Sequence, residues 1–445
     1  MRFRVSKGER RGQRRGYPQV TTVPVPHTFH RIDGRAAVQS TVRRIRHTVL
    51  AALAALALTT ALTAAAAPAG ATTTAAHAAA SAASATSTAS ATSTGQPGDI
   101  VSAEPSRFMP NPLVLTSTRA WKIRYRSTTA TGAPNVVSGT VLVPDDGRTG
   151  QRPLVTYAVG TVGLADSCAP SRGFPTGTTA EGSLIWQALL RGWAVAVTDY
   201  EGLGTPGTHT YTVGRADGQA VLDAARAAER LPGTGLNADT PVGIMGYSQG
   251  GQASSWAAEI HDSYAPGLNV RGTATGGVPA DLLKVADFNN GGVGAGLILA
   301  AAVGHDAAYP ALDLAKYLND NGRSVVNIVK TQCVAIDAIA GLFQRIDQVT
   351  VSNPLYQADW QSALRADALG THAPDAPVYL YHGVIDELIP YTVGQQLRAD
   401  WCAKGVDVQW QSMPLGHITG AIAGSPFAMA WLADRFAGHP TAGNC

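Results

Sequence analysis

The sequence predicts an α/β fold with a mostly parallel central sheet and helices on both faces. Short apolar runs of strand length alternate with segments of helical periodicity. Most of these runs are nearly continuous, which is typical of strands buried on both faces. A stretch from about 279 to 370 shows no clear strand pattern and predicts a helical insertion between two strands.

The predicted elements follow one another along the chain. The strands are expected at 121–125, 136–143, 153–159, 193–198, 242–245, 270–275, 378–381 and 408–413. Helices are expected at 214–231 and 249–261, and the insertion contains apolar helical material such as 297–303 and 325–343. We interpret the insertion as a cap over a site, and the alternative is a separate helical domain with its own role.

Charge is unevenly distributed along the 445 residues. Residues 1–47 hold 12 Lys/Arg against 2 Asp/Glu, whereas residues 98–445 hold 22 against 29. The part of the chain that can fold is therefore mildly acidic, which argues against a nucleic-acid-binding surface.

The N-terminal residues have the pattern of an export signal. Residues 42–47 are basic, residues 48–67 are an uncharged Ala/Leu run, and Ala69-Gly70-Ala71 is a small-residue cleavage signature. We expect a signal at 42–71 behind an N-terminal extension, and a secreted, extracellular protein; an uncleaved membrane anchor is the alternative. Residues 72–97 are almost wholly Ala, Ser, Thr and Gly, and predict a disordered linker before a single domain at 98–445.

The four cysteines are Cys168, Cys333, Cys402 and Cys445. In an exported chain, an even number without short C-x-x-C spacing predicts two disulfides and no metal site. The spacing permits three pairings and does not select one.

A G-x-S-x-G motif, Gly246-Tyr247-Ser248-Gln249-Gly250, lies between a predicted strand and a predicted helix. A sharp strand-to-helix turn lifts a serine oxygen clear of the sheet, as a nucleophile requires. A serine hydroxyl also needs a base, and the base needs an acid to hold it in one tautomer. Ser248 is therefore a candidate nucleophile if an acid and a histidine follow it.

The acid and the base are expected at the ends of later strands. Asp386 follows the strand at 378–381, although the adjacent Glu387 is not excluded. Only His417 and His439 follow Asp386 in the chain, and His417 comes directly after the strand at 408–413. We favour His417, because His439 lies in a Gly/Pro-rich tail.

Acyl transfer also needs hydrogen-bond donors for an oxyanion. The N–H of Gln249 is one candidate, and Thr161, in Gly160-Thr161-Val162-Gly163, offers an N–H and a hydroxyl. The alternative for the second segment is an ordinary tight glycine turn.

At these residues the chain resembles the secretory lipase family of α/β-hydrolases, the family of lipase A from a Candida yeast and its actinobacterial relatives. The resemblance spans about residues 100 to 440. It includes GTVG and CAPS at 160–171, DYEGLGTPG at 199–207, GVPADL at 277–282, the GYSQGG elbow, the segment 382–390, and Gly416-His417.

The resemblance implies an α/β-hydrolase fold, with Ser248 as nucleophile, Asp386 as acid, His417 as base, and oxyanion donors near Thr161 and at Gln249. It also implies a cap over an acyl-binding tunnel and disulfides between Cys168 and Cys333 and between Cys402 and Cys445. Val159 departs from the family pattern, because many relatives have a histidine there. Asp199, Tyr200 and Glu201 are interpreted as rim residues that hydrogen-bond the loops of the site.

We expect a secreted serine carboxylester hydrolase, a lipase or esterase, that cleaves acyl esters through an acyl-serine with no metal or organic cofactor. Its expected partners are a lipid or small ester substrate and, transiently, a lipid–water interface; we expect a monomer. Two other hypotheses remain: an acyltransferase or amide hydrolase with the same residues, and a non-catalytic lipid-binding protein.

Overall fold

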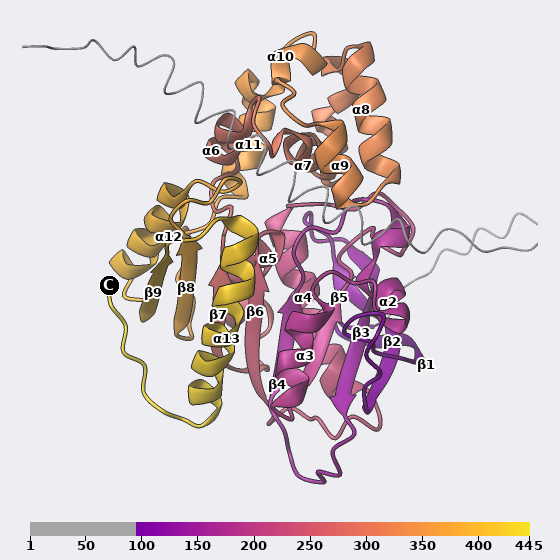
Figure 1. Cartoon of the computed structure of the whole chain (residues 1–445), viewed down its shortest axis with the longest axis vertical. Helices are drawn as coiled ribbons and strands as arrows, with labels where there is room; N and C mark the ends of the chain where they lie inside the picture. The colour runs from indigo at the N-terminus through magenta and orange to yellow at the C-terminus, as the bar shows by residue number, and fades with distance from the viewer. Residues whose placement is uncertain (1–94) are drawn as a thin grey trace, which may run out of the picture. The chain divides into compact units, whose positions relative to one another are not determined.

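The computed structural model describes residues 95–445. The predicted N-terminal extension, the secretory signal and most of the linker lie outside the described residues. The described part is built on a nine-stranded sheet in the order β1-β2-β3-β5-β4-β6-β7-β8-β9 (Figure 1).

The sheet is antiparallel at one edge and parallel through the rest. Its strands are β1 (Ile100–Ser106), β2 (Thr118–Thr128), β3 (Pro134–Pro144), β4 (Leu154–Ala158), β5 (Ala194–Thr198), β6 (Pro241–Tyr247), β7 (Asn269–Gly276), β8 (Val378–Gly383) and β9 (Val408–Met413). β1, β2, β3 and β5 pair antiparallel, and all pairs from β5 through β4 to β9 are parallel. The predicted mostly parallel α/β sheet is therefore confirmed.

Burial explains why some strands were predictable and one was not. β4, β5 and β8 are buried along their whole length, which corresponds to their continuous apolar runs. β1 was missed, because it is an edge strand with largely exposed side chains and has little apolar pattern.

Helices cover both faces of the sheet (Figure 1). α3 (Gly182–Leu190) and α13 (His417–Phe436) pack on one face, while α4 (Gly214–Arg230) and α5 (Gln249–Tyr264) pack on the other. α12 (Tyr391–Ala403) lies with α5, and its Trp401 donates a hydrogen bond of 2.8 Å to Glu259 of α5. A short α2 (Pro170–Gly173) precedes α3.

The segment between β7 and β8 is helical, and we call it the insertion. It contains α6 (Leu282–Asn289), α7 (Ala295–Ala308), α8 (Asp320–Thr331), α9 (Val334–Ala340), α10 (Ile346–Val349) and α11 (Ala358–Ala366). Its helices lie together beyond one end of the strands (Figure 1). Leu299, Val303 and Trp360 of the insertion share a hydrophobic cluster with Leu164 and Tyr211 from loops of the sheet domain, so the two parts pack against each other.

The helical stretch expected at 325–343 is divided between the end of α8 and α9, and the helix is interrupted between them. At the break, Cys333 forms an isolated β-bridge with Gly163, and the N–H of Val334 donates to the carbonyl of Val162 at 2.9 Å. A backbone committed to this pairing cannot also continue α8. The contact is close, since a Cβ on Gly163 would lie 2.6 Å from the Cα of Cys333.

Among residues 95–445, no single helix is long and apolar enough to cross a bilayer. α7 and the 3₁₀ segment Pro310–Tyr317 reach that length and hydropathy only together, across a 115° bend.

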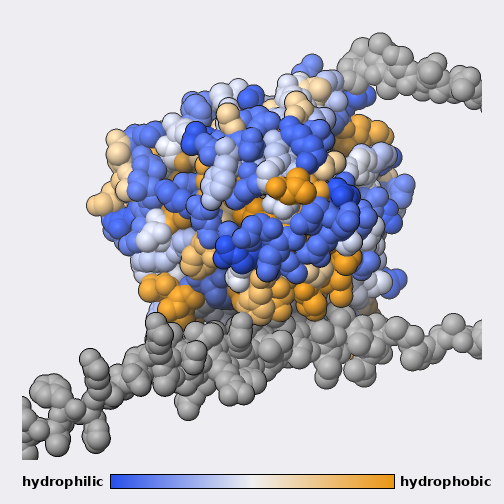
Figure 2. All heavy atoms as spheres, turned by 90° about the horizontal axis from the view of Figure 1, so that it is seen from above, coloured by the Kyte–Doolittle hydropathy of each residue, from blue (hydrophilic) through white to orange (hydrophobic). Residues whose placement is uncertain are grey.

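Seen from above, the molecule presents mostly hydrophilic residues, with several hydrophobic groups among them (Figure 2).

Candidate active site

Ser248 stands at the turn from β6 into α5 with a strained backbone. Its φ of 62° and ψ of −123° are unusual for a residue with a side chain. The flanking glycines are required by space: a Cβ on Gly246 would lie 2.0 Å from the carbonyl oxygen of Gly250, and one on Gly250 would lie 2.0 Å from that of Ala158. The G-x-S-x-G pattern is thus a packing requirement of this turn.

His417, the first residue of α13, contacts both Ser248 and Asp386. Its Nε2 lies 2.8 Å from Oγ of Ser248, and its Nδ1 lies 2.7 Å from Oδ2 of Asp386. Because a carboxylate only accepts, Nδ1 carries the proton, and Nε2 is left to accept from the serine hydroxyl. The hydroxyl of Tyr247 donates to the carbonyl of His417 at 2.9 Å and fixes the start of the helix.

Asp386 is held in the loop after β8 by its other oxygen. Oδ1 accepts from the N–H groups of Leu388 at 2.9 Å and Ile389 at 2.8 Å. Burial raises the pKa of Asp386, but hydrogen bonds from His382 and His417 outweigh it and hold that pKa well below its usual range. The carboxylate is therefore ionised and able to stabilise an imidazolium.

The structure distinguishes the candidates that the sequence left open. Glu387 is exposed and accepts from the backbone N–H of His417 at 2.9 Å, not from its ring. His439 is exposed and pairs with Asp434 at 3.1 Å, in the tail after α13. Ser248, His417 and Asp386 are thus brought together, and Glu387 and His439 are not part of that chain of hydrogen bonds.

The two expected oxyanion donors lie on separate segments. Gln249 is the first residue of α5, where backbone N–H groups have no intrahelical acceptor. Thr161 follows β4, and its hydroxyl is 2.8 Å from the hydroxyl of Tyr211. The neighbouring N–H of Gly160 donates to Oε1 of Glu181 at 2.8 Å. Sequence reasoning missed Tyr211 and Glu181, because neither belongs to a strand-end motif.

The DYEGLG segment holds neighbouring loops in place. Asp199 is fully buried, and accepts from the N–H of Ser171 at 2.8 Å and from Oγ of Ser138 at 2.6 Å. The hydroxyl of Tyr200 donates to the carbonyl of Val159 at 2.7 Å, just before the Thr161 segment. These contacts agree with the interpretation of Asp199 and Tyr200 as residues that hydrogen-bond the loops.

Disulfides join Cys168 to Cys333 and Cys402 to Cys445. The first connects the segment after Thr161 to the insertion, 165 residues further along the chain. The second attaches the C-terminal residue to α12. The described residues contain no free cysteine.

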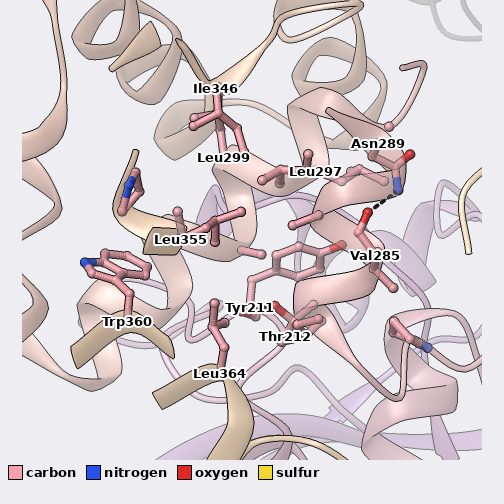
Figure 3. A pocket seen from close by; sticks show the side chains of 18 of the residues that line it. Tyr211, Thr212, Val285, Asn289, Leu297, Leu299, Ile346, Leu355, Trp360 and Leu364 are labelled. Carbon is pink, nitrogen blue, oxygen red and sulfur yellow. Dashed lines mark hydrogen bonds between the residues drawn. The ribbon is translucent and has the colours of Figure 1, made fainter. Parts of the chain in front are cut away.

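A largely apolar pocket begins at Ser248 and extends under the insertion. Figure 3 shows side chains of the insertion, among them Leu297, Leu355 and Leu364, around Tyr211. The leucine, isoleucine and valine residues of the lining are Leu282, Val285, Leu297, Ile298, Leu299, Leu314, Leu318, Ile346, Leu355, Leu364, Leu388 and Ile389. Such a pocket accommodates a hydrocarbon chain whose polar end is at the serine.

This sheet, with a serine, a histidine and an aspartate gathered at the ends of its strands, is an α/β-hydrolase fold. The family model described as "Secretory lipase" matches residues 171–444. The chain belongs to the secretory lipase family and is an ester hydrolase of the lipase kind.

Three similar proteins illustrate the relationship. The secreted triacylglycerol lipase LIP5 of Malassezia furfur is 31% identical over 332 residues, which cover 69% of this chain and 84% of the relative. A probable inactive lipase of Mycobacterium tuberculosis is 32% identical over 349 residues, 75% of this chain and 76% of the relative. The crystal structure of Candida antarctica lipase A in its closed state has a TM-score of 0.70 at 24% identity, covering 78% of this chain and 84% of that chain.

Proposed function

We propose that the protein is a secreted serine hydrolase that cleaves fatty acyl esters, triacylglycerol among them, through an acyl-serine. The observation that carries the proposal is the continuous set of hydrogen bonds from Asp386 through His417 to Ser248, at the end of an apolar pocket. The two donor–acceptor distances, 2.7 Å from His417 to Asp386 and 2.8 Å from His417 to Ser248, are within hydrogen-bond range without any rearrangement.

The geometry supports a two-step reaction. Oγ of Ser248 attacks the ester carbonyl carbon while Nε2 of His417 takes the hydroxyl proton. The carbon–oxygen bond to the alcohol breaks, and His417 gives that proton to the leaving oxygen. Water then attacks the acyl-serine, with His417 taking and returning a proton, and the carboxylic acid leaves. Asp386 stays ionised throughout and stabilises the imidazolium.

Negative charge develops on the carbonyl oxygen in both steps. We assign its stabilisation to the N–H of Gln249 and to the N–H and hydroxyl of Thr161. If Tyr211 donates to the hydroxyl oxygen of Thr161, the hydroxyl proton of Thr161 is free to point at the oxyanion.

The pocket lining supports a long acyl chain as the preferred acid part. Burying a chain against aliphatic side chains contributes about 0.8 kcal/mol for each methylene group, so affinity rises with length until the pocket is full. The name of the Malassezia furfur relative, a secreted triacylglycerol lipase, supports both this substrate and export of the chain. The signal pattern at 42–71 supports export by cleavage of that segment.

The name of the Mycobacterium tuberculosis relative makes a non-catalytic protein the relevant alternative. Against this, the present chain has a serine, a histidine and an aspartate in hydrogen-bond contact. The test is hydrolysis of p-nitrophenyl esters with acyl chains of 2 to 16 carbons by the purified protein and by Ser248→Ala. We expect turnover that rises with chain length and is abolished in Ser248→Ala. No turnover by the wild type, or equal turnover by both, would contradict the proposal.

A further inference from the structure

His209 contacts Gln249, the residue after the candidate nucleophile, without belonging to the Ser248–His417–Asp386 set. Its side chain is fully buried, and its Nδ1 is 3.0 Å from the carbonyl oxygen of Glu201 in the DYEGLG segment. A carbonyl only accepts, so Nδ1 carries the proton. Burial lowers the pKa of His209 to about 4, so the ring is neutral and its Nε2 is an acceptor.

The acceptor of His209 faces the residue that follows the nucleophile. The side-chain amide of Gln249 donates to Nε2 of His209 at 3.1 Å and to Oδ2 of Asp217, on α4, at 3.2 Å. Both amide hydrogens of Gln249 are thus used, one by His209 in the loop after β5 and one by Asp217 on α4. These two hydrogen bonds restrict the side chain of Gln249 at the first position of α5, where its backbone N–H also lies.

The ring of His209 also contacts the two tyrosines that hold the other donor segment. It stacks on Tyr200 with centroids 5.8 Å apart and planes at 17°, and lies 6.0 Å from Tyr211. Tyr200 donates to the carbonyl of Val159, and Tyr211 is hydrogen-bonded to the hydroxyl of Thr161. The buried ring of His209 therefore contacts Gln249 directly and also contacts the two tyrosines that hold the segment of Thr161.

We propose that His209 is a positioning residue that fixes the distance between the oxyanion donors of Gln249 and Thr161. This rests on the function proposed above. His209 acts through Gln249 and the two tyrosines and does not touch the substrate. Oxyanion stabilisation depends on where the donors are placed before the reaction, and loss of one donor lowers kcat about 10²- to 10³-fold in well-studied hydrolases. Displacement of a donor should cost less than its removal.

The test compares two substitutions of His209 that retain different contacts with its neighbours. His209→Phe keeps a ring against the tyrosines but removes both hydrogen bonds, whereas His209→Gln retains an acceptor toward Gln249. We expect His209→Phe to lower kcat for p-nitrophenyl butyrate about 10- to 100-fold with KM unchanged within threefold. Inhibition by butylboronic acid, which forms a tetrahedral adduct on a serine, should weaken by a similar factor, and His209→Gln should recover most of both losses.

A matched control and a double variant separate positioning from general damage. His261→Phe also removes a buried histidine that has two hydrogen-bond partners, Asp375 and Leu268, at the far end of α5, and should change kcat less than twofold. Gln249→Ala removes the other half of the contact and provides the test if His209→Phe does not fold. His209→Phe and Gln249→Ala both remove the hydrogen bond between His209 and Gln249. The double variant should therefore lose no more activity than the worse single variant.

Several outcomes would overturn the inference. They are a kcat of His209→Phe within threefold of the wild type, a rise in KM alone, an equal loss in His261→Phe, or losses that multiply in the double variant. Ser248→Ala keeps this inference distinct from the proposed function. Full activity in Ser248→Ala contradicts both, while an inactive Ser248→Ala beside a normal His209→Phe contradicts only the role of His209.

Discussion

Nε2 of His417 lies 2.8 Å from Oγ of Ser248, although the two residues are 169 positions apart in the chain. β6 ends just before Ser248 and β9 ends four residues before His417, and both strands run parallel in one sheet. Parallel strands place their carboxyl ends at one edge, which is why distant residues meet there. The contact between Ser248 and His417 is therefore a consequence of sheet topology.

Asp386→Asn should lower kcat for p-nitrophenyl esters by about 10⁴-fold, by analogy with the aspartate of the serine-protease triad. An asparagine keeps the size of the side chain but favours the wrong tautomer of His417 and removes a charge. Glu387→Gln is the matched control, since Glu387 accepts from the backbone N–H of His417, and it should lose less than tenfold. A larger loss in Glu387→Gln than in Asp386→Asn would reverse the assignment of the acid.

Ala301→Phe should shift substrate preference toward shorter acyl chains. Ala301 is on α7 and lines the pocket, so a phenyl ring there would fill space that a long acyl chain needs. We expect hydrolysis of the 16-carbon ester to fall more than tenfold, while that of the 4-carbon ester stays within threefold. Ala307→Phe, on the same helix but outside the pocket lining, should leave the chain-length profile unchanged. A uniform loss over all chain lengths would contradict the assignment of the pocket to the acyl chain.

Removal of the Cys168–Cys333 disulfide should cost both stability and activity. The bridge closes a long loop and holds the insertion against the segment after Thr161, and loss of such a bridge costs about 2 to 5 kcal/mol. Cys402→Ser with Cys445→Ser removes the bridge that closes only 43 residues, away from the site, and should lower Tm while kcat stays within twofold. Thermal unfolding and ester hydrolysis are measured for this variant and for Cys168→Ser with Cys333→Ser. Equal losses of kcat in the two variants would contradict a role of the Cys168–Cys333 bridge in holding the insertion near the site.

Stability should fall between about pH 4 and pH 7, and Asp337 should contribute to this fall. Its side chain is buried in α9, neither oxygen has a hydrogen-bond partner among the described residues, and burial raises its pKa to about 7. The folded state keeps the proton that the unfolded chain loses near pH 4, so the free energy of unfolding decreases as the pH rises through this range.

Asp337→Asn should weaken that dependence without removing it, because burial also raises the pKa of Glu229 to about 7 and that of Asp367 to about 8. The variant should be more stable than the wild type by about 2 kcal/mol at pH 8, and the difference should vanish below pH 4. Asp262→Asn, an exposed position on α5, should leave the profile of Tm against pH unchanged. Parallel wild-type and Asp337→Asn profiles would show that Asp337 does not carry the effect.

Substitution of Ile385 and Ile418 by serine should weaken adsorption to emulsified triglyceride. The two side chains are 68% and 59% exposed, and each is next in sequence to a member of the Asp386–His417 pair. An exposed apolar rim beside the site is suited to a lipid–water interface. Turnover of soluble p-nitrophenyl butyrate should change less than threefold, and Leu113→Ser with Leu115→Ser, at positions that are also exposed, should not affect adsorption.

Much of the fold and of the candidate site was predictable, because it depends on local patterns. Buried parallel strands such as β5 and β8 are continuous apolar runs, and residues just after a strand end in such a sheet lie at one edge. The same logic singled out Ser248, Asp386 and His417. It could not find β1, whose side chains are mostly exposed, or the break between α8 and α9, which depends on a contact with Gly163 far away in the sequence.

The sequence alone therefore determined the α/β architecture, the order of the three polar residues and the presence of a helical insertion, since periodicity and chain order carry that information. Only the tertiary structure decided that Asp386 and not Glu387 faces the ring of His417, that the four cysteines pair as the family resemblance implied, and that His209 contacts both Gln249 and the tyrosines that hold the segment of Thr161. Adjacent residues in a loop point in different directions, and buried side chains meet across elements distant in the sequence. Both depend on side-chain direction in the folded chain, which one-dimensional patterns do not specify.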